Sequence, residues 1–213
     1  MNFETFIKSI SKIKNLNLPG ESSQFKMSPP FRRELIADNK AKMQNAKQAG
    51  VMALFYPNKE GETYLILILR KTYKGVHSAQ VGFPGGKFEV SDVNLKYTAL
   101  RETFEEVGVP KEDVSVIKKM SELYIPPSNF TVAPYIGIAN KTPQFVKQED
   151  EVEDLIEVAL SHFLDDANTG DVAVMTSMDV QLEVPAFTLN GYVVWGATAM
   201  MLSELKDLLK KVL

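Results

Sequence analysis

Residues 83–109 read FPGGKFEVSDVNLKYTALRETFEEVGV, which is a glycine pair and a short acidic loop followed by a run of helix-forming residues. Successive residues of an α-helix are about 100° apart, so side chains at positions i, i+3 and i+4 point in one direction. Glu102, Glu105 and Glu106 have this spacing. We expect the opposite side of the helix to be the buried one. That side carries Leu100, Thr103, Phe104 and Val107.

Three carboxylates on one helical turn repel each other unless a cation lies among them. Hard oxygen ligands of this kind suit Mg²⁺ or Mn²⁺, and Mg²⁺ binds few carboxylates together with water and substrate phosphate. The alternative is an acidic helix face that only meets solvent, because runs of charge are usually solvated. Gly85 and Gly86 favour a site, since a backbone without Cβ atoms can turn sharply there and approach an anion with its N–H groups.

The glycines and the acidic helix together resemble the signature of the Nudix hydrolases, G-x5-E-x7-R-E-U-x-E-E-x-G-U, in which U is a bulky apolar residue. The matching positions are Gly86, Arg101, Glu102, Glu105, Glu106, Gly108 and Val109. Thr103 takes the first apolar position. One residue is extra in the loop, so the acidic position falls on Asp92 when counted from Gly86 and on Val93 when counted back from Arg101. The resemblance implies that Arg101 binds the loop acid, which leaves its partner open.

The extra residue is similar to the box of the coenzyme A diphosphatase branch of this family, in which FPGGK precedes the loop and TALRE begins the helix. Here these stretches are residues 83–87 and 98–102. Arg70 and the lead-in HSAQVGF at 77–83 also resemble upstream elements of that branch. Downstream, YIPPSNFTVAP at 124–134 resembles a further segment, with a proline in place of a threonine. The resemblance covers about residues 47–160.

The fold class predicted from the chain is α/β. Apolar runs of strand length and amphipathic helices are intermixed without strict βαβ repetition, so we expect a mixed β-sheet covered by helices on both sides. The resemblance implies the same architecture, a Nudix-type α/β/α sandwich with a catalytic loop–helix–loop. Strands are expected near 51–56, 63–69, 81–83, 114–123, 131–139, 172–184 and 187–194, and a strand followed by a short helix at 155–163.

We expect residues 1–213 to form a single domain. Residues 1–45 are an N-terminal helical extension and connector, 83–109 the Nudix box, and 195–213 a C-terminal amphipathic helix. The extension begins with a docking stripe made of Phe3, Phe6, Ile7, Ile10 and Ile13. Prolines, serines and a glycine predict a connector at 15–30.

The composition is that of an ordinary globular domain, with 45% hydrophobic and 24% charged residues among 213. A formal net charge of −3 argues against a nucleic acid or an anionic membrane surface as the main partner. The absence of cysteine excludes disulfides, thiolate zinc sites and cysteine catalysis. No apolar run reaches the roughly 18 residues needed to span a bilayer. We therefore expect a cytoplasmic protein. The resemblance implies that it acts on a small nucleotide resembling coenzyme A, and the sequence leaves a homodimer open.

The candidate ligands of Mg²⁺ or Mn²⁺ are Glu102, Glu105 and Glu106, as the resemblance also implies. Arg101 lies four residues before Glu105 and can pair with its carboxylate. The predicted catalytic residues are Arg101, Glu105, Glu106 and Glu151.

Glu151 is the first choice for a general base because it lies in QEDEVED, residues 148–154, where family members place an acid that reaches the metal. Glu149 and Glu153 remain open. The alternative for this whole segment is an acidic loop that only meets solvent.

Substrate binding is assigned to Arg70, Gly85, Gly86 and Lys87. The backbone of the two glycines and the nearby lysine can hold phosphate oxygens. Arg70 can clamp a phosphate with two N–H groups, although an arginine at a strand end is more often a surface salt-bridge residue.

Three further residues have a chemical alternative. His77 either bonds substrate or is a satisfied loop residue, whereas His162 on an apolar helix is expected to be structural. Trp195 is expected in the core rather than stacked on a base.

The leading hypothesis is a divalent-metal-dependent diphosphatase that cleaves coenzyme A or its thioesters to 4′-phosphopantetheine, or its acyl form, and 3′,5′-ADP. One alternative is a Nudix hydrolase of ADP-ribose, a dinucleotide or a nucleoside triphosphate. Another is a catalytically silent module that binds a nucleotide and regulates a partner. The silent module is disfavoured because all three helix glutamates are present.

Overall fold

The computed structural model of the protein describes residues 1–72, 79–175 and 181–213. Its main sheet contains β1 (Lys47–Pro57), β2 (Thr63–Arg70), β3 (Val81–Gly82), β4 (Gly85–Lys87), β5 (Val114–Lys119), β6 (Leu123–Ile125), β7 (Phe130–Ala139) and β8 (Val152–Ala159). The path of the sheet is β3-β2-β1-β7-β5, while β4 pairs with β1, β6 with β7 and β8 with β2. β1 and β7 are parallel and the other pairs are antiparallel, so the sheet is mixed, as predicted.

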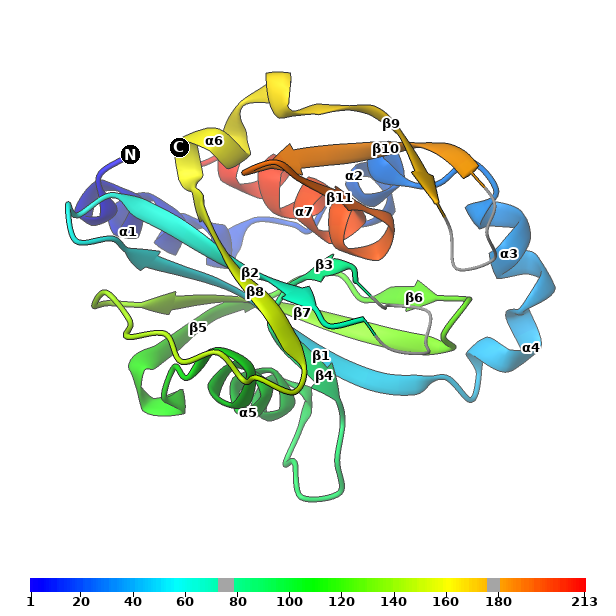
Figure 1. Cartoon of the computed structure of the whole chain (residues 1–213), viewed down its shortest axis with the longest axis horizontal. Coiled ribbons are helices and arrows are strands. Elements are labelled where there is room, and N and C mark those ends of the chain that lie inside the picture. Colours follow the sequence, from blue (N-terminus) through cyan, green and yellow to red (C-terminus); the bar gives the residue numbers. More distant parts are fainter. Residues whose placement is uncertain (73–78, 176–180) are drawn as a thin grey trace.

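Helices cover both faces of this sheet (Figure 1). The helix α5 (Leu95–Val107) lies on one face, and α1 (Phe3–Ile10) and α7 (Gly196–Lys210) lie on the other. Because successive side chains of a strand point to opposite faces, β1 supplies both cores. Phe55 packs in the cluster under α1 and α7, and Leu54 packs in the cluster under α5. These two layers confirm the α/β/α sandwich.

Local signals explain where α5 begins and ends. The side chain of Asn94 accepts a hydrogen bond from the N–H of Tyr97 at 3.0 Å and caps the first turn. Gly108 takes the left-handed conformation at φ 77° and donates its N–H to the carbonyl of Phe104 at 2.9 Å, which ends the helix. Gly50 of β1 lets the helix approach the sheet, since an added Cβ would lie 2.2 Å from the carbonyl oxygen of Leu95.

The buried face of α5 differs from the predicted one. Thr103 and Val107 are buried as expected, but Phe104 is 49% exposed and Glu106 is only 2% exposed. Close approach to β1 turns the side centred on Ala99 and Thr103 toward the sheet, and Glu106 continues that side at the next turn. The third glutamate of the helix therefore points into the protein, where a partner must receive its carboxylate.

The N-terminal extension contains several short helices. After α1 follow two 3₁₀ helices and three short α-helices: η1 (Ser11–Asn15), α2 (Glu21–Gln24), η2 (Phe25–Met27), α3 (Arg32–Asp38) and α4 (Lys40–Met43). The connector expected at 15–30 thus contains the short helices α2 and η2. Tertiary contacts stabilise α2, because the buried carboxylate of Glu204 on α7 accepts hydrogen bonds from Gln24 at 3.0 Å and from Ser121 at 2.7 Å.

The predicted docking stripe of α1 is confirmed. Phe3, Phe6, Ile10 and Ile13 are buried in the cluster shared with α7, and Ile7 packs against it.

The C-terminal part adds a second sheet beside α7 (Figure 1). It consists of β9 (Thr169–Met175), β10 (Gln181–Leu189) and β11 (Tyr192–Trp195), and it follows α6 (Leu160–Leu164) and η4 (Asp166–Asn168); the remaining 3₁₀ helix is η3 (Lys111–Asp113). The strand expected at 172–184 overlaps two antiparallel strands, β9 and β10. Trp195 is only partly buried and pairs with Ala186 at the end of β11, so the terminal helix begins one residue later than predicted.

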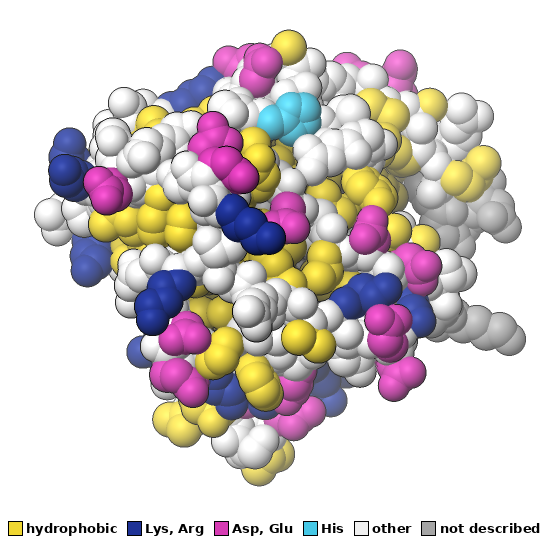
Figure 2. Space-filling model, turned by 60° about the vertical axis from the view of Figure 1, so that its left-hand side comes forward, with side chains coloured by type: hydrophobic (Ala, Val, Ile, Leu, Met, Phe, Trp, Pro, Cys, Tyr) yellow, Lys and Arg dark blue, Asp and Glu magenta, His cyan; other side chains and the backbone are white. Residues whose placement is uncertain are grey.

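The surface carries both signs of charge. Figure 2 shows basic and acidic side chains interspersed with apolar ones on the face that it presents, which agrees with the small formal net charge of −3. Within the described parts of the chain, no helix is long and apolar enough to cross a membrane.

Candidate active site

At each of the two glycines between β3 and α5, a side chain is excluded for a different geometric reason. Gly85 has φ 151°, and an added Cβ would lie 2.5 Å from the carbonyl oxygen of Gly50 and from the Cα of Val51. A Cβ on Gly86 would lie 2.5 Å from the carboxyl group of Glu102. The first glycine thus permits the backbone path beside β1, and the second leaves room for a helix carboxylate.

Glu106 joins the helix to this turn. Its Oε2 accepts a hydrogen bond from the N–H of Gly85 at 2.7 Å, and its Oε1 lies 3.4 Å from Nη2 of Arg70. Burial raises the pKa of Glu106 to about 7, against the opposing effects of Arg70 and of the Gly85 hydrogen bond. The N–H of Gly85 thus donates to a carboxylate of the protein. From the sequence we expect this N–H to be a free donor for a substrate phosphate, and in this respect the structure differs.

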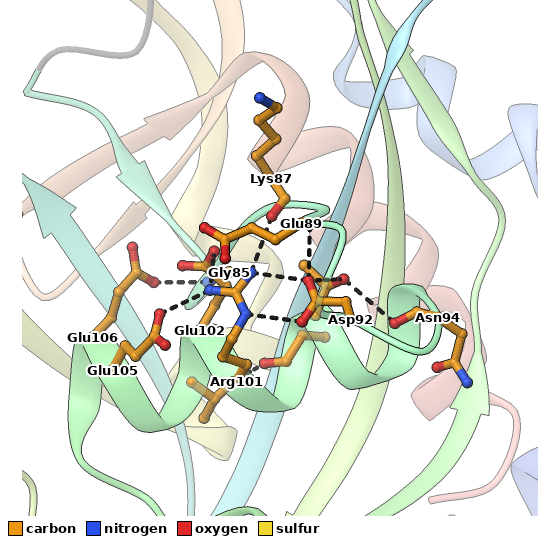
Figure 3. Close-up of polar contacts among 12 residues, drawn as sticks. Gly85, Lys87, Glu89, Asp92, Asn94, Arg101, Glu102, Glu105 and Glu106 are labelled. Atoms are coloured by element: carbon orange, nitrogen blue, oxygen red, sulfur yellow. Dashed lines mark hydrogen bonds and ion pairs between the residues drawn. The ribbon is translucent and has the colours of Figure 1, made fainter.

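Arg101 organises the acidic groups around the turn (Figure 3). Its guanidinium binds both oxygens of Asp92, through Nε at 2.9 Å and Nη2 at 3.0 Å. Nη1 contacts Glu105 at 2.8 Å and Glu102 at 2.9 Å, and Nη2 donates to the carbonyl of Lys87 at 3.1 Å. One planar side chain therefore connects the loop, the glycine turn and two helix glutamates.

The loop acid is Asp92. It is buried, and the hydrogen bonds from Arg101 lower its pKa to about 2. Val93 is 80% exposed, so the position counted back from Arg101 does not hold the acid. The spacing counted from Gly86 therefore holds, and the extra residue lies between Asp92 and Arg101.

The helix glutamates form a donor set of hard oxygens that fits a divalent cation. Burial raises the pKa of Glu102 as well as that of Glu106. The neighbouring positive charges and hydrogen bonds therefore do not fully offset the loss of water around these two carboxylates, and a cation could do so. Glu105 is about half exposed. Among the described residues, no cluster of three or more His, Cys, Asp or Glu side chains is already arranged to hold a metal. Instead, the guanidinium of Arg101 lies against Glu102 and Glu105, and that of Arg70 against Glu106.

The two candidate substrate-binding side chains, those of Arg70 and Lys87, take different positions relative to the carboxylates. Arg70, at the end of β2, donates from Nη2 to the carbonyl of Gly85 at 2.7 Å, and its side chain is 26% exposed. It therefore belongs to the carboxylate site and is not a surface salt-bridge residue. Lys87 contributes its carbonyl to Arg101, while its side chain extends away from the carboxylates (Figure 3).

The negative charge of Glu151, the candidate general base, acts on the carboxylates of two helix glutamates, Glu102 and Glu106. Burial is the main cause of the raised pKa of Glu102 and Glu106, and the negative charge of Glu151 adds to both. Glu149, Glu151 and Glu153 are all exposed, and Glu149 pairs with Lys147 at 3.5 Å. Of the three acids considered in this segment, Glu151 is the one whose charge acts on both buried carboxylates.

Gln148 is absent from the residues predicted from the sequence, yet it connects this segment to the helix. Its N–H donates to the carbonyl of Glu106 at 3.1 Å, and its side-chain oxygen accepts the N–H of Glu151 at 2.6 Å. The signal available in the sequence is an amide side chain three residues before an acid, a spacing at which polar side chains cap short turns.

The histidine that the structure describes, His162, makes its contacts away from the carboxylate site. Nδ1 of His162 lies 3.0 Å from the side-chain nitrogen of Asn168, and its Nε2 accepts the N–H of Asn190 at 3.2 Å, so this histidine is structural, as predicted. His77 lies outside the described residues.

A mixed sheet between two helical layers, with a glycine turn and an arginine-linked set of glutamates on one helix, defines a hydrolase of the Nudix class. The NUDIX domain family model matches residues 46–177, and the chain belongs to this family. It is accordingly a pyrophosphohydrolase of a family whose members generally use divalent metals and act on small nucleotides.

Relatives of known name support this assignment. The chain is similar to human mitochondrial coenzyme A diphosphatase NUDT8, with 28% identity covering 79% of the chain and 72% of the relative. The peroxisomal coenzyme A diphosphatase ndx-8 of Caenorhabditis elegans is 28% identical over 78% of the chain and 70% of its own length. The uncharacterized Nudix hydrolase NudL of Citrobacter koseri is 34% identical over 76% of the chain and 82% of its own length.

Solved structures show the same fold. The Nudix hydrolase RenU of M. smegmatis superposes with a TM-score of 0.55 at 16% identity, covering 79% of this chain and 88% of that one. A MutT/nudix family protein from Enterococcus faecalis gives 0.51 at 14% identity, covering 84% and 74%. At these identities the similarity concerns the fold alone.

Proposed function

We propose that the protein hydrolyses the diphosphate of coenzyme A or its thioesters to 4′-phosphopantetheine, or its acyl form, and 3′,5′-ADP. The observation that carries the hydrolytic part is the buried Glu106 carboxylate, bonded to the glycine turn beside Glu102 and Arg70. The choice of substrate is supported by the printed names of the human and nematode relatives, and by the flanking segments at 77–83 and 124–134 that resemble the same branch.

Glu102, Glu105 and Glu106 would hold the metal, Mg²⁺ or Mn²⁺. When bound, such an ion neutralises charge that develops on the phosphoryl oxygens and lowers the pKa of a bound water. Arg101 keeps Glu102 and Glu105 in place through its bonds to Asp92 and the Lys87 carbonyl. Arg70 lies at the edge of the same site with a partly exposed guanidinium, which suits it to bind a substrate phosphate.

Glu151 takes the role of general base in this proposal. The attacking water oxygen forms a bond to one phosphorus, its proton passes to the Glu151 carboxylate, and the bond from that phosphorus to the bridging oxygen breaks. The second phosphate group leaves with the bridging oxygen. The negative charge of Glu151, which acts on Glu102 and Glu106, supports its presence at this side of the site.

The experiment is a substrate panel with purified protein and either Mg²⁺ or Mn²⁺. Coenzyme A, an acyl-coenzyme A, 3′-dephospho-coenzyme A, ADP-ribose, NADH and nucleoside triphosphates are compared by kcat/KM, with Glu106→Gln as the inactive control. We expect coenzyme A or a thioester to be preferred, and 4′-phosphopantetheine or its acyl form and 3′,5′-ADP to be the products. Preference for ADP-ribose, a dinucleotide or a triphosphate would overturn the substrate. Nucleotide binding without any turnover would indicate the silent module.

Two further parts of the proposal concern the protein in the cell. A cytoplasmic location is tested by imaging a fluorescent fusion, against the mitochondrial and peroxisomal locations stated in the names of the human and nematode relatives. A homodimer is tested separately, by light scattering of the purified protein.

A further inference from the structure

The segment after β7 returns to the end of α5 before it enters β8. Val146 donates its N–H to the carbonyl of Val107 at 3.1 Å, and Gln148 donates its N–H to the carbonyl of Glu106 at 3.1 Å. The last four carbonyls of a helix have no partner within the helix, so these bonds satisfy two of them. Gln148 is thereby anchored to the residue whose side chain is the buried carboxylate of the site.

From this anchor the side chain of Gln148 reaches forward. Its Oε1 accepts the N–H of Glu151 at 2.6 Å, and its own carbonyl accepts the N–H of Val152 at 3.0 Å. Gln148 thus closes the short turn at 148–152 with two hydrogen bonds, one through its side chain and one through its backbone carbonyl.

The other side of Glu151 is held by the β2 edge of the site. Its carbonyl accepts the N–H of Lys71 at 2.9 Å, and the adjacent Arg70 pairs with Val152 in the β2–β8 ladder. The backbone of Glu151 is therefore fixed from two directions, by Gln148 toward α5 and by Lys71 toward Arg70. Of these two contacts to Glu151, the one from Gln148 uses a side chain and can be removed by substitution.

We propose that Gln148 is a positioning residue for Glu151, holding Glu151 at a constant place relative to Glu106 through its side-chain oxygen. This inference rests on the proposed function in that Glu151 takes part in hydrolysis. A proton acceptor that is held in place is more effective than a mobile one, because orientation is already provided before the reaction. Loss of the contact is therefore expected to lower kcat and to leave KM nearly unchanged.

The test compares three single variants. Gln148→Met keeps the length of the side chain but has no oxygen, and we expect kcat to fall about tenfold with KM within about twofold. Gln148→Asn keeps an oxygen acceptor, and asparagine commonly accepts N–H groups two or three residues ahead, so it is expected to recover most of kcat. Gln144→Met alters an exposed amide of the same segment and is the matched control, with wild-type kcat.

A second measurement does not depend on activity. Amide hydrogen exchange of the peptide containing Glu151 is followed in metal-free protein, and it should be faster in Gln148→Met than in the wild type, Gln148→Asn or Gln144→Met. Thermal unfolding of each variant identifies any general loss of structure.

A double-mutant cycle with Glu151→Gln decides whether Gln148 acts through the acid. We expect Gln148→Met to have little further effect when Glu151 is already replaced. Equal effects of Gln148→Met in both backgrounds, failure of Gln148→Asn to recover kcat, or wild-type turnover by Glu151→Gln would each overturn the inference. If coenzyme A is not the preferred substrate, the same variants are measured on the substrate that is, so a failure of the substrate assignment stays distinct from a failure of the positioning role.

Discussion

Glu106 and Gly85 are joined by a hydrogen bond of 2.7 Å from the glycine N–H to the buried carboxylate. The acidic helix and the glycine turn therefore form one unit, although 21 positions separate the two residues. Burial of that carboxylate costs stability as long as no cation compensates its charge. In the proposed metal site, a bound divalent cation would remove this cost.

Replacing Glu106 by Gln is expected to stabilise the metal-free protein at neutral pH while abolishing hydrolysis. The pKa of Glu106 is raised to about 7 from a usual value near 4.5, so the folded state binds more protons than the unfolded state between these values. Stability of the metal-free wild type should thus fall as pH rises from 5 to 8, and Glu106→Gln should remove about 1–3 kcal/mol of that fall. Urea denaturation at several pH values measures the free energy of unfolding of both proteins. The same dependence of this free energy on pH in the wild type and in Glu106→Gln would contradict the prediction.

Metal affinity is expected to weaken below neutral pH. A proton on Glu106 competes with the ion, so the dissociation constant for Mn²⁺ should rise by up to about tenfold for each pH unit below 7. Isothermal titration between pH 5.5 and 8 gives the dependence. An affinity that does not change over this range would show that Glu106 is not a ligand.

Asp92→Asn is expected to destabilise the protein and to lower activity. The change leaves the guanidinium of Arg101 without its buried, bidentate partner, and loss of one member of such a pair costs about 3–5 kcal/mol. Because the pKa of Asp92 is lowered to about 2, its contribution is present above pH 4 and is lost as pH falls through 2.

The matched control for Asp92→Asn is Lys119→Ala, which breaks an exposed pair with Glu122 and should change stability by less than about 1 kcal/mol. Denaturation midpoints at pH 7 compare the two variants. Equal losses in both would mean that the Arg101–Asp92 pair adds nothing beyond a surface contact.

Gly86→Ala is expected to reduce turnover at least about tenfold without unfolding the protein. The new Cβ would lie 2.5 Å from the carboxyl atoms of Glu102, which are the far end of a flexible side chain and can move away. A displaced metal ligand lowers the rate because the geometry of the site is lost. Gly170→Ala is the control, since nothing lies within 4 Å of its added Cβ. Kinetics and thermal unfolding of both variants provide the comparison, and wild-type kcat in Gly86→Ala would contradict the placement of Glu102.

The parts of this fold that could be predicted are those with local signals. Asn94, Gly108 and Pro110 mark the ends of α5, and β1 and β2 are evident from continuous apolar runs. The spacing of the family signature identified the helix carboxylates, and the i,i+4 spacing of Arg101 and Glu105 predicted the pair that the structure contains.

The parts that could not be predicted depend on contacts distant in sequence. The side of α5 that is buried is set by its approach to Gly50, which turns Glu106 inward and leaves Phe104 exposed. Counting alone left the loop acid open between Asp92 and Val93, because an extra residue can be absorbed on either side. The four-residue helix α2 is too short to be stable by itself and depends on Glu204, 180 positions away from Gln24.

The most direct test of the account is a crystal of the protein soaked with Mn²⁺ and measured at the manganese absorption edge. We predict an anomalous peak within coordination distance of carboxylate oxygens of Glu102, Glu105 and Glu106, beside the Gly85–Gly86 turn. A map in which these three side chains hold no manganese while the ion binds elsewhere would contradict the assignment of this helix as the metal site.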